Sequence, residues 1–317
     1  MSELPNKVAI IGAGEIGCGW AALCSSAGWP VTVFDSSARS LERAFIEVPR
    51  RARALVALER ATAGIVERGL VEFEAGRSLL MAVKDADWVI EAIPEDVLAK
   101  QKLFDAIDQI AAPEALITSS SSGLLPSELF ARCRRQDRCL VAHPLNPPEL
   151  IPLVEVVPSE HTAAPYVTRA QDYLNALGRV PILVKRAVPG YAIGRISAAV
   201  WRECVDLVLA GVIDVDSLDR AVALGPALGW AAAGPHLTYH LAAGEAGIKV
   251  FLQRLLASFE QRWSELASWH QLEPEQQRAL TVAIERAYKG HLAELGHARD
   301  QRLSALLRAL EHARTDS

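Results

Sequence analysis

Short apolar runs alternate with helical stretches from residue 7 to about residue 185. Runs of about four to eight residues, rich in branched aliphatics and bounded by Gly, Pro or polar turns, are typical of buried strands. Their alternation with helices predicts a largely parallel sheet covered by helices on both faces. The predicted strands are KVAII, VTVF, WVIEAI, ALITSS, RCLVAH, IPLVEVV and PILVK.

The pattern changes after VKRAVPGY, and from Tyr191 onward only helical periodicity remains, as in ISAAVWRECVDLVLAGV and LSALLRALEHAR. Pro189-Gly190 is a natural boundary between the two regions. We therefore predict an α/β domain over residues 1–188 and an all-helical domain over residues 189–317. The Arg- and Ala-rich segment between residues 37 and 77 predicts a protruding pair of helices.

Composition narrows the class of protein. Half of the 317 residues are apolar and 22% are charged, as in an ordinary globular protein. The net charge of -5 and the pI near 5.9 argue against nucleic acid or an anionic membrane as the partner. The five cysteines form no CxxC pair and no metal-ligand spacing, so we expect reduced thiols and no metal site. No signal peptide or membrane span is evident, and we expect a cytoplasmic protein.

A glycine-rich turn, Gly12-x-Gly14-x-x-Gly17, follows the first predicted strand and precedes a helix. The first glycine permits a tight turn, the second lets the backbone approach a pyrophosphate, and the third allows close helix packing. Asp35 ends the next strand, where a carboxylate can bind both ribose hydroxyls and repel a 2'-phosphate. This context predicts a Rossmann-type, doubly wound domain that binds NAD. Arg39 lies close enough to leave NADP as an alternative.

A histidine and a glutamate suggest the chemistry. His143 ends the run CLVAH, and Glu155 lies within the run LVEVV, where an ionised carboxylate needs a partner. At the end of a strand His143 would face the ligand crevice and could act as the base for a hydroxyl proton. Glu155 would orient the imidazole, and Asn146 would supply a neutral donor and acceptor. The alternative is a hydrogen-bonded core histidine.

Together with Asp35, the segments GAGEIG, EAIPEDVLAK, SSSSGLLPS, HPLNPPELIPLVEVV and VPGY carry a resemblance. In this order, the chain resembles the 3-hydroxyacyl-CoA dehydrogenase family over nearly its whole length. The resemblance implies that His143 and Glu155 form a catalytic dyad and that Ser122 and Asn146 contact substrate or nicotinamide. It also implies that the cofactor site is lined by Ala92, Glu95 and Lys100. Two alternatives are a helix N-cap region at Ser122 and a solvated Lys100.

Two features depart from that family. Many members carry an asparagine soon after the Pro-Gly boundary, where this chain has Gly194. Glycine costs a helix about 1 kcal/mol relative to alanine and offers no amide. Substrate polarisation would then come from elsewhere, such as water or Arg195. The C-terminal Lys-Thr-Gly segment typical of the acyl-CoA enzymes is also missing, and the corresponding stretches are similar to the lambda-crystallin/L-gulonate 3-dehydrogenase branch and to L-carnitine 3-dehydrogenase.

We therefore expect a small L-3-hydroxy acid, such as L-gulonate or L-carnitine, to be oxidised to its 3-keto product. A quaternary ammonium would need an aromatic or acidic site, although such aromatic residues more often belong to a core. The candidates are Trp201, Trp230, His236, Tyr239, His240 and Glu245.

Two other functions remain open. The chain could oxidise a 3-hydroxyacyl-CoA, with the CoA phosphates bound by Arg50, Arg51 and Arg53, although such arginine clusters usually form a solvated face. It could instead be an NADH-binding structural or sensing protein with little turnover. By resemblance we also expect a homodimer, formed by the apolar helices that carry Trp263 and Trp269.

Overall fold

The computed structural model describes residues 4–315, with side chains described as far as residue 311. The chain divides into two compact units, Met1–Arg195 and Ile196–Ser317. The division lies a few residues beyond the predicted boundary after residue 188.

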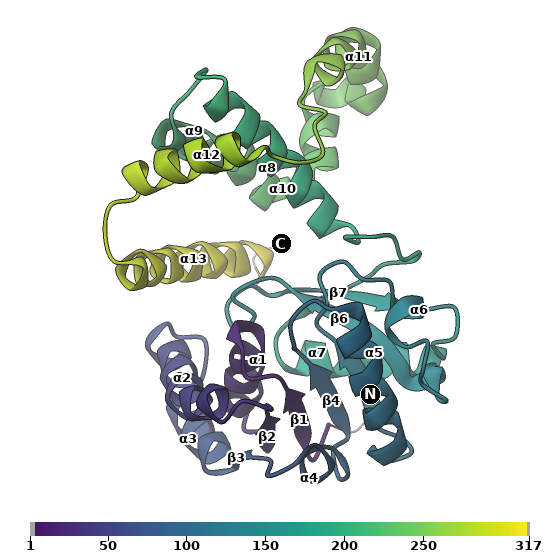
Figure 1. The fold of residues 1–317 in the computed structure, drawn as a ribbon. Coiled ribbons are helices and arrows are strands. Elements are labelled where there is room, and N and C mark those ends of the chain that lie inside the picture. The colour runs from purple at the N-terminus through teal and green to yellow at the C-terminus, as the bar shows by residue number, and fades with distance from the viewer. Residues whose placement is uncertain (1–3, 316–317) are drawn as a thin grey trace. The chain divides into compact units, whose positions relative to one another are not determined.

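The first unit is built on one eight-stranded sheet (Figure 1). Its strand order is β3-β2-β1-β4-β5-β6-β7-β8, and every neighbouring pair is parallel except β6 and β7, which are antiparallel. This confirms the doubly wound, mostly parallel sheet. The strands are β1 (Val8–Ile11), β2 (Val31–Phe34), β3 (Phe73–Ala75), β4 (Trp88–Glu91), β5 (Leu116–Ser119), β6 (Cys139–Pro144), β7 (Leu153–Pro158) and β8 (Val180–Leu183).

All seven predicted strands are present, and β3 is the strand that the sequence pattern missed. It has three residues and lies within the segment assigned to a helix pair. So short a run shows no alternation that could separate it from the end of a helix.

Two layers of helices cover the sheet. Alternate residues of one strand face opposite sides, so that Val8 and Ile10 pack in the core that contains α1, α2, α3 and α7. Ala9 and Ile11 pack on the other side, in the core that contains α4, α5 and α6. The helices of this unit are α1 (Glu15–Ser26), α2 (Ala38–Ala57), α3 (Ala63–Val71), α4 (Leu79–Val83), α5 (Val97–Ile110), α6 (Pro126–Leu129), η1 (Gln136–Arg138) and α7 (Ala164–Ala176).

The second unit is entirely helical in the part that the structure describes, which confirms the predicted all-helical domain. Its elements are α8 (Ile193–Leu209), which begins in the first unit, α9 (Val215–Leu224), α10 (Pro226–Leu241), η2 (Gly244–Ala246), α11 (Gly247–Glu265), α12 (Pro274–Ala287) and α13 (Leu292–Thr315). Helix α10 is kinked at Gly234, which has φ +71° and precedes Pro235. Among the described residues, no helix combines the length and the apolar character needed to cross a membrane.

Candidate active site

The glycine turn joins β1 to α1, and a different steric reason explains the glycine at each of its three positions. Gly12 has φ +108°, and a Cβ there would lie 2.6 Å from the carbonyl oxygen of Ala92. A Cβ on Gly17 would lie 1.8 Å from the carbonyl oxygen of Gly12. A Cβ on Gly14 would meet nothing within 4 Å, so this position leaves open space where α1 begins. Open space at a helix N-terminus fits the pyrophosphate of a dinucleotide.

Asp35 is fixed just after β2 by two backbone groups. Its Oδ2 accepts a hydrogen bond from the N–H of Ala13 at 2.8 Å, and its Oδ1 accepts one from Ser37 at 2.8 Å. A carboxylate has about four acceptor positions, so two remain for ribose hydroxyls. The residues present therefore fit an adenosine ribose beside the glycine turn.

Lys100 is buried beside the turn that follows β4. Its side chain is 1% exposed, and its ammonium donates to Glu91 Oε1 at 2.5 Å and to the carbonyl oxygen of Ile93 at 3.1 Å. Burial raises the pKa of the Glu91 carboxyl, while the Lys100 ammonium and the Ser119 hydroxyl oppose that shift. The alternative of a solvated Lys100 is therefore wrong.

Glu95 joins the turn after β4 to the serine run after β5. Its Oε1 accepts hydrogen bonds from Ser121 Oγ at 2.5 Å and from the N–H of Ser122 at 3.2 Å, and its Oε2 lies 3.4 Å from Lys100 Nζ. The side chain of Ser122 is exposed. The N-cap of α6 is Leu125, so Ser122 does not cap that helix.

His143 and Glu155 face each other across β6 and β7. They are register partners, so their side chains leave the sheet on the same side. His143 Nδ1 lies 2.9 Å from Glu155 Oε2, and Glu155 has no exposed surface. The other oxygen, Oε1, accepts hydrogen bonds from the N–H groups of Ala192 and Ile193 at 2.9 and 3.1 Å.

The surroundings keep Glu155 ionised. Burial on its own raises the pKa of the Glu155 carboxyl, but the hydrogen bond with His143 and the two backbone N–H groups outweigh it, and the pKa lies below its usual range. A carboxylate accepts and cannot donate, so the proton of a neutral His143 lies on Nδ1. Nε2 is then the nitrogen that can take a proton.

Tyr191 is a site residue that the sequence analysis missed. It is fully buried, and its ring centroid lies 5.6 Å from that of His143. Its backbone has φ +47°, an unusual value for a bulky residue, directly before the two N–H groups that bind Glu155. Burial raises the pKa of the Tyr191 hydroxyl, which donates to the carbonyl oxygen of Leu124. The only indication in the sequence is the aromatic residue directly after Pro189-Gly190.

The predicted Asn146 and the position of the missing asparagine, Gly194, lie near these groups. Asn146 is exposed in the loop that follows β6, and its peptide bond to Pro147 is cis. A Cβ on Gly194 would meet only the carbonyl oxygen of Ser122, at 3.5 Å. The position of the missing asparagine therefore lies beside Ser122.

The candidates for an ammonium site all belong to the helical unit. Trp201 is 61% exposed and lines a cavity of about 380 Å³ together with Asp219 and Tyr288. Tyr239 instead packs against Phe251 and Phe259, with ring centroids 5.3 and 5.5 Å away. Of the other candidates, Trp230 is half-buried, whereas His236, His240 and Glu245 are exposed.

Comparison with known proteins agrees with this geometry. Residues 7–187 match the 3-hydroxyacyl-CoA dehydrogenase NAD binding domain, and residues 190–280 match the C-terminal domain of the same family. An L-carnitine dehydrogenase from Burkholderia mallei is 39% identical over 266 residues, which cover 83% of this chain and 81% of that protein. An L-carnitine dehydrogenase from Pseudomonas aeruginosa is 37% identical over 312 residues, which cover 96% of this chain and 94% of that protein.

A solved structure gives the same fold. It is an NAD⁺-dependent dismutase, 5-formyl-3-hydroxy-2-methylpyridine 4-carboxylic acid 5-dehydrogenase, with a TM-score of 0.83 and 30% identity. The similarity covers 96% of this chain and 98% of that one. The resemblance found in the sequence is confirmed, and the cofactor is NAD. The chain belongs to the 3-hydroxyacyl-CoA dehydrogenase family, as an NAD-dependent dehydrogenase.

Proposed function

We propose that this enzyme oxidises the 3-hydroxyl group of L-carnitine, or of a closely related free L-3-hydroxy acid, to the 3-keto product. The observation that carries the proposal is the buried pair of His143 and Glu155 at 2.9 Å, in a chain with an NAD-binding domain. The relatives named L-carnitine dehydrogenase, which match most of the chain, support the choice of substrate.

The chemistry follows from the orientation of the imidazole. His143 Nε2 takes the proton of the 3-hydroxyl while the hydride leaves C3, and bound NAD supplies the hydride acceptor. The imidazolium that forms is stabilised by the Glu155 carboxylate, which stays ionised because Ala192 and Ile193 also donate to it. Ser122 and Asn146, both exposed near the dyad, are the side chains that we assign to the substrate or the nicotinamide.

A free acid is favoured over a CoA thioester. The three arginines that could bind CoA phosphates are already paired with carboxylates: Arg50 with Glu47, Arg51 with Glu15, Glu47 and Glu149, and Arg53 with Glu67. L-gulonate remains the second free acid, because the sequence around His143 is similar to that branch. The dismutase with the same fold adds an aromatic carboxylate that bears an aldehyde as a third substrate class.

The test is a substrate panel. Initial rates of NAD reduction should be measured with L-carnitine, D-carnitine, L-gulonate and L-3-hydroxybutyryl-CoA, and NAD-dependent turnover with a pyridine carboxylate aldehyde. We expect the highest kcat/KM for L-carnitine, and a higher value for either of the other classes would reassign the substrate. Tight NADH binding without turnover of any compound would favour the structural or sensing protein.

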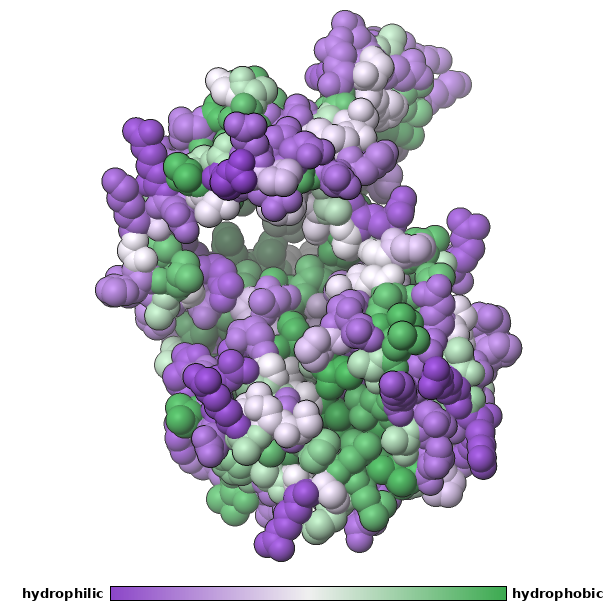
Figure 2. Space-filling view, viewed as in Figure 1, coloured by the Kyte–Doolittle hydropathy of each residue, from purple (hydrophilic) through white to green (hydrophobic). Residues whose placement is uncertain are grey.

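We further propose that the helical unit is completed by a second copy of the chain. Among its described side chains, the buried hydrophobic residues are Val205, Phe251 and Leu280. Many large apolar side chains are exposed instead, including Trp201, with 61% of its surface exposed, and Trp263, with 58%. Figure 2 shows apolar residues among the hydrophilic ones on this unit. Trp269 is not part of this exposed set: it is half-buried, and its Nε1 donates to Asp206 Oδ1 at 2.9 Å.

So much exposed apolar surface is more typical of an interface than of a monomer. Sedimentation analysis should give twice the chain mass, and Trp263→Glu should lower the apparent mass. A wild-type monomer at micromolar concentration would contradict the homodimer.

The cysteines are unpaired in the described residues, which supports placing the protein in the reducing cytoplasm.

A further inference from the structure

Two arginines hold the β6–β7 loop, residues 145–152, which carries Asn146. The guanidinium of Arg179, 8% exposed, donates to the carbonyl oxygens of Pro148, Glu149 and Ile151. The second arginine, Arg51, comes from α2 and binds the Glu149 side chain, with Nη1 3.2 Å from Oε1. Helix α2 follows β2, near one end of the sheet. It therefore fixes the loop beside His143, which joins β6 and β7 near the other end.

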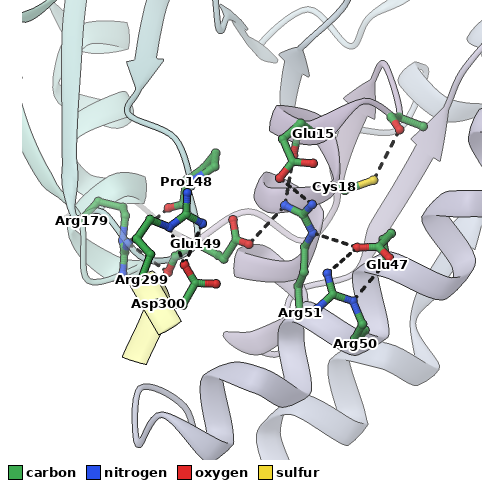
Figure 3. A network of polar contacts seen from close by, with 11 residues as sticks. Glu15, Cys18, Glu47, Arg50, Arg51, Pro148, Glu149, Arg179, Arg299 and Asp300 are labelled. Carbon is green, nitrogen blue, oxygen red and sulfur yellow. Dashed lines mark hydrogen bonds and ion pairs between the residues drawn. The ribbon is translucent and has the colours of Figure 1, made fainter. Parts of the chain in front are cut away.

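Arg51 differs from the other arginines of its helix. The side chains of Arg50 and Arg53 are 63% and 58% exposed, as in an ordinary solvated face. The side chain of Arg51 is 10% exposed, and Figure 3 shows it between Glu15 and Glu149. Its Nη2 donates to Glu15 Oε1 at 2.6 Å, and its Nη1 also reaches the carbonyl oxygen of Glu15 at 3.4 Å.

Glu15 occupies a sensitive position. It is the first residue of α1 and directly follows Gly14, where the glycine turn would hold the dinucleotide pyrophosphate. An unpaired carboxylate at this point would repel the pyrophosphate. The ion pair with Arg51 offsets that repulsion, and the same guanidinium also contacts Glu149.

The loop also touches α1 directly. A Cβ on Gly19 would lie 2.6 Å from Glu149 Oε2 and 2.8 Å from Pro148 Cδ. The absence of a side chain at Gly19 lets the loop pack on the helix that binds the cofactor. Arg51 and Gly19 are thus two contacts between the pyrophosphate end of the site and the loop that carries Asn146.

We propose that Arg51 is a positioning residue, which joins the first turn of α1 to Glu149 so that NAD binding and the position of the β6–β7 loop are coupled. Binding of the pyrophosphate at Gly14 and Glu15 fixes the Arg51 guanidinium, and through Glu149 the loop is held ready for the hydroxy acid. Such coupling through one contiguous ionic network is reciprocal: the position of the loop also affects the affinity for the dinucleotide. The proposal rests on the proposed function for its effect on turnover.

The test uses hydrogen exchange, which needs no substrate. Exchange of the amides of residues 149–151 is measured with and without saturating NADH in wild type, Arg51→Gln, Glu149→Gln and the control Arg53→Gln. NADH should slow exchange of this segment in wild type and in Arg53→Gln, but not in Glu149→Gln or Arg51→Gln. Equal protection by NADH in all four proteins would overturn the proposal.

Kinetics separate positioning from a merely structural role. Turnover is expressed as kcat per NADH-binding site, which a smaller folded fraction does not change. Glu149→Gln should lower this kcat about tenfold and should weaken NADH binding by the coupling factor, because coupling between two sites is reciprocal. Arg51→Gln should weaken NADH binding further, by about tenfold, because Glu15 also loses its partner. A wild-type kcat per site in both variants would contradict the positioning role.

A second variant covers the case in which Arg51→Gln does not fold. Gly19→Ala keeps the helix of α1 but places a methyl group against the ring of Pro148, so it should lower kcat per site while NADH still binds. Unchanged turnover in Gly19→Ala and Glu149→Gln would overturn the effect on turnover. If wild type turns over no substrate but the NADH-dependent protection is lost in Glu149→Gln, the proposed function fails and the coupling stands.

Discussion

Glu155 is held at both of its oxygens: Oε2 lies 2.9 Å from His143 Nδ1, and Oε1 accepts the N–H groups of Ala192 and Ile193. The carboxylate thus binds the imidazole on the neighbouring strand and the backbone that follows Pro189-Gly190. One acidic side chain fixes both the tautomer of His143 and the turn that leads into α8.

Replacing Glu155 by glutamine should lower kcat by about a hundredfold or more, because an amide cannot stabilise the imidazolium as a carboxylate does. NADH affinity should change less than twofold, since the dyad lies on β6 and β7 and not at the glycine turn. Steady-state kinetics and fluorescence titration measure the two quantities. A fall in kcat of less than threefold would argue that Glu155 only supports the fold.

The same carboxyl predicts a pH dependence of stability. The pKa of Glu155 is lower in the folded protein than its usual value, because its hydrogen bonds outweigh the effect of burial. Its contribution is present above the unfolded-state pKa of about 4.3 and is lost as the pH falls through the folded pKa. Urea unfolding from pH 7 down to pH 3.5 should show a steeper loss of stability in wild type than in Glu155→Gln. Parallel curves would contradict this assignment.

The glycine turn allows folding and cofactor binding to be separated. Gly14→Ala should keep the wild-type Tm, because its Cβ meets no atom within 4 Å, yet weaken NADH binding at least about tenfold by occupying the pyrophosphate space. Gly17→Ala should fail to fold, because its Cβ would lie 1.8 Å from a carbonyl oxygen. Thermal melts and NADH titration test both. Normal NADH affinity in Gly14→Ala would place the pyrophosphate elsewhere.

Asp35 should determine the choice of dinucleotide. Asp35→Asn should raise the Kd for NADH by about tenfold to a hundredfold, because hydrogen bonds to a charged acceptor contribute about 1.5–3 kcal/mol. The penalty against NADPH should shrink, because the charge that repels the 2'-phosphate is gone. Titration of wild type and variant with both dinucleotides provides the comparison. An unchanged NADH-to-NADPH ratio would exclude Asp35 from the ribose site.

Lys100→Met should destabilise the fold by about 3–5 kcal/mol, the usual cost of leaving one member of a buried ion pair without its partner. Glu91 has no exposed surface and is bonded to the Lys100 ammonium. The double variant Glu91→Gln/Lys100→Met should recover part of that loss. Chemical unfolding of wild type, the single variant and the double variant measures these changes in the free energy of unfolding. A stable Lys100→Met protein with poor NADH binding would instead make Lys100 a direct cofactor contact.

The sequence predicted the sheet and the dyad because their patterns are local. Each long strand is a continuous apolar run, and an acid inside such a run requires a partner, so the pattern predicted that Glu155 pairs with His143. The Gly-x-Gly-x-x-Gly spacing likewise predicts a tight turn from neighbouring residues alone.

The sequence could not predict contacts between distant segments. Tyr191 packs on His143 only because the chain returns to β7 after Pro189-Gly190, and the burial of Lys100 depends on where α5 lies on the sheet. Arg51 belongs to a helix whose arginine run is typical of a solvated face. Its burial follows from two partners, Glu15 and Glu149, that lie far from it in the sequence.

In the proposed mechanism, His143 is the base of an NAD-dependent dehydrogenase. The most direct measurement is NAD reduction by wild type and by His143→Ala on the best substrate of the panel, each normalised to its NADH-binding sites. We predict that kcat in His143→Ala falls at least about a hundredfold while NADH affinity stays within twofold. Turnover within tenfold of wild type in a variant that binds NADH normally would show that His143 is not the base.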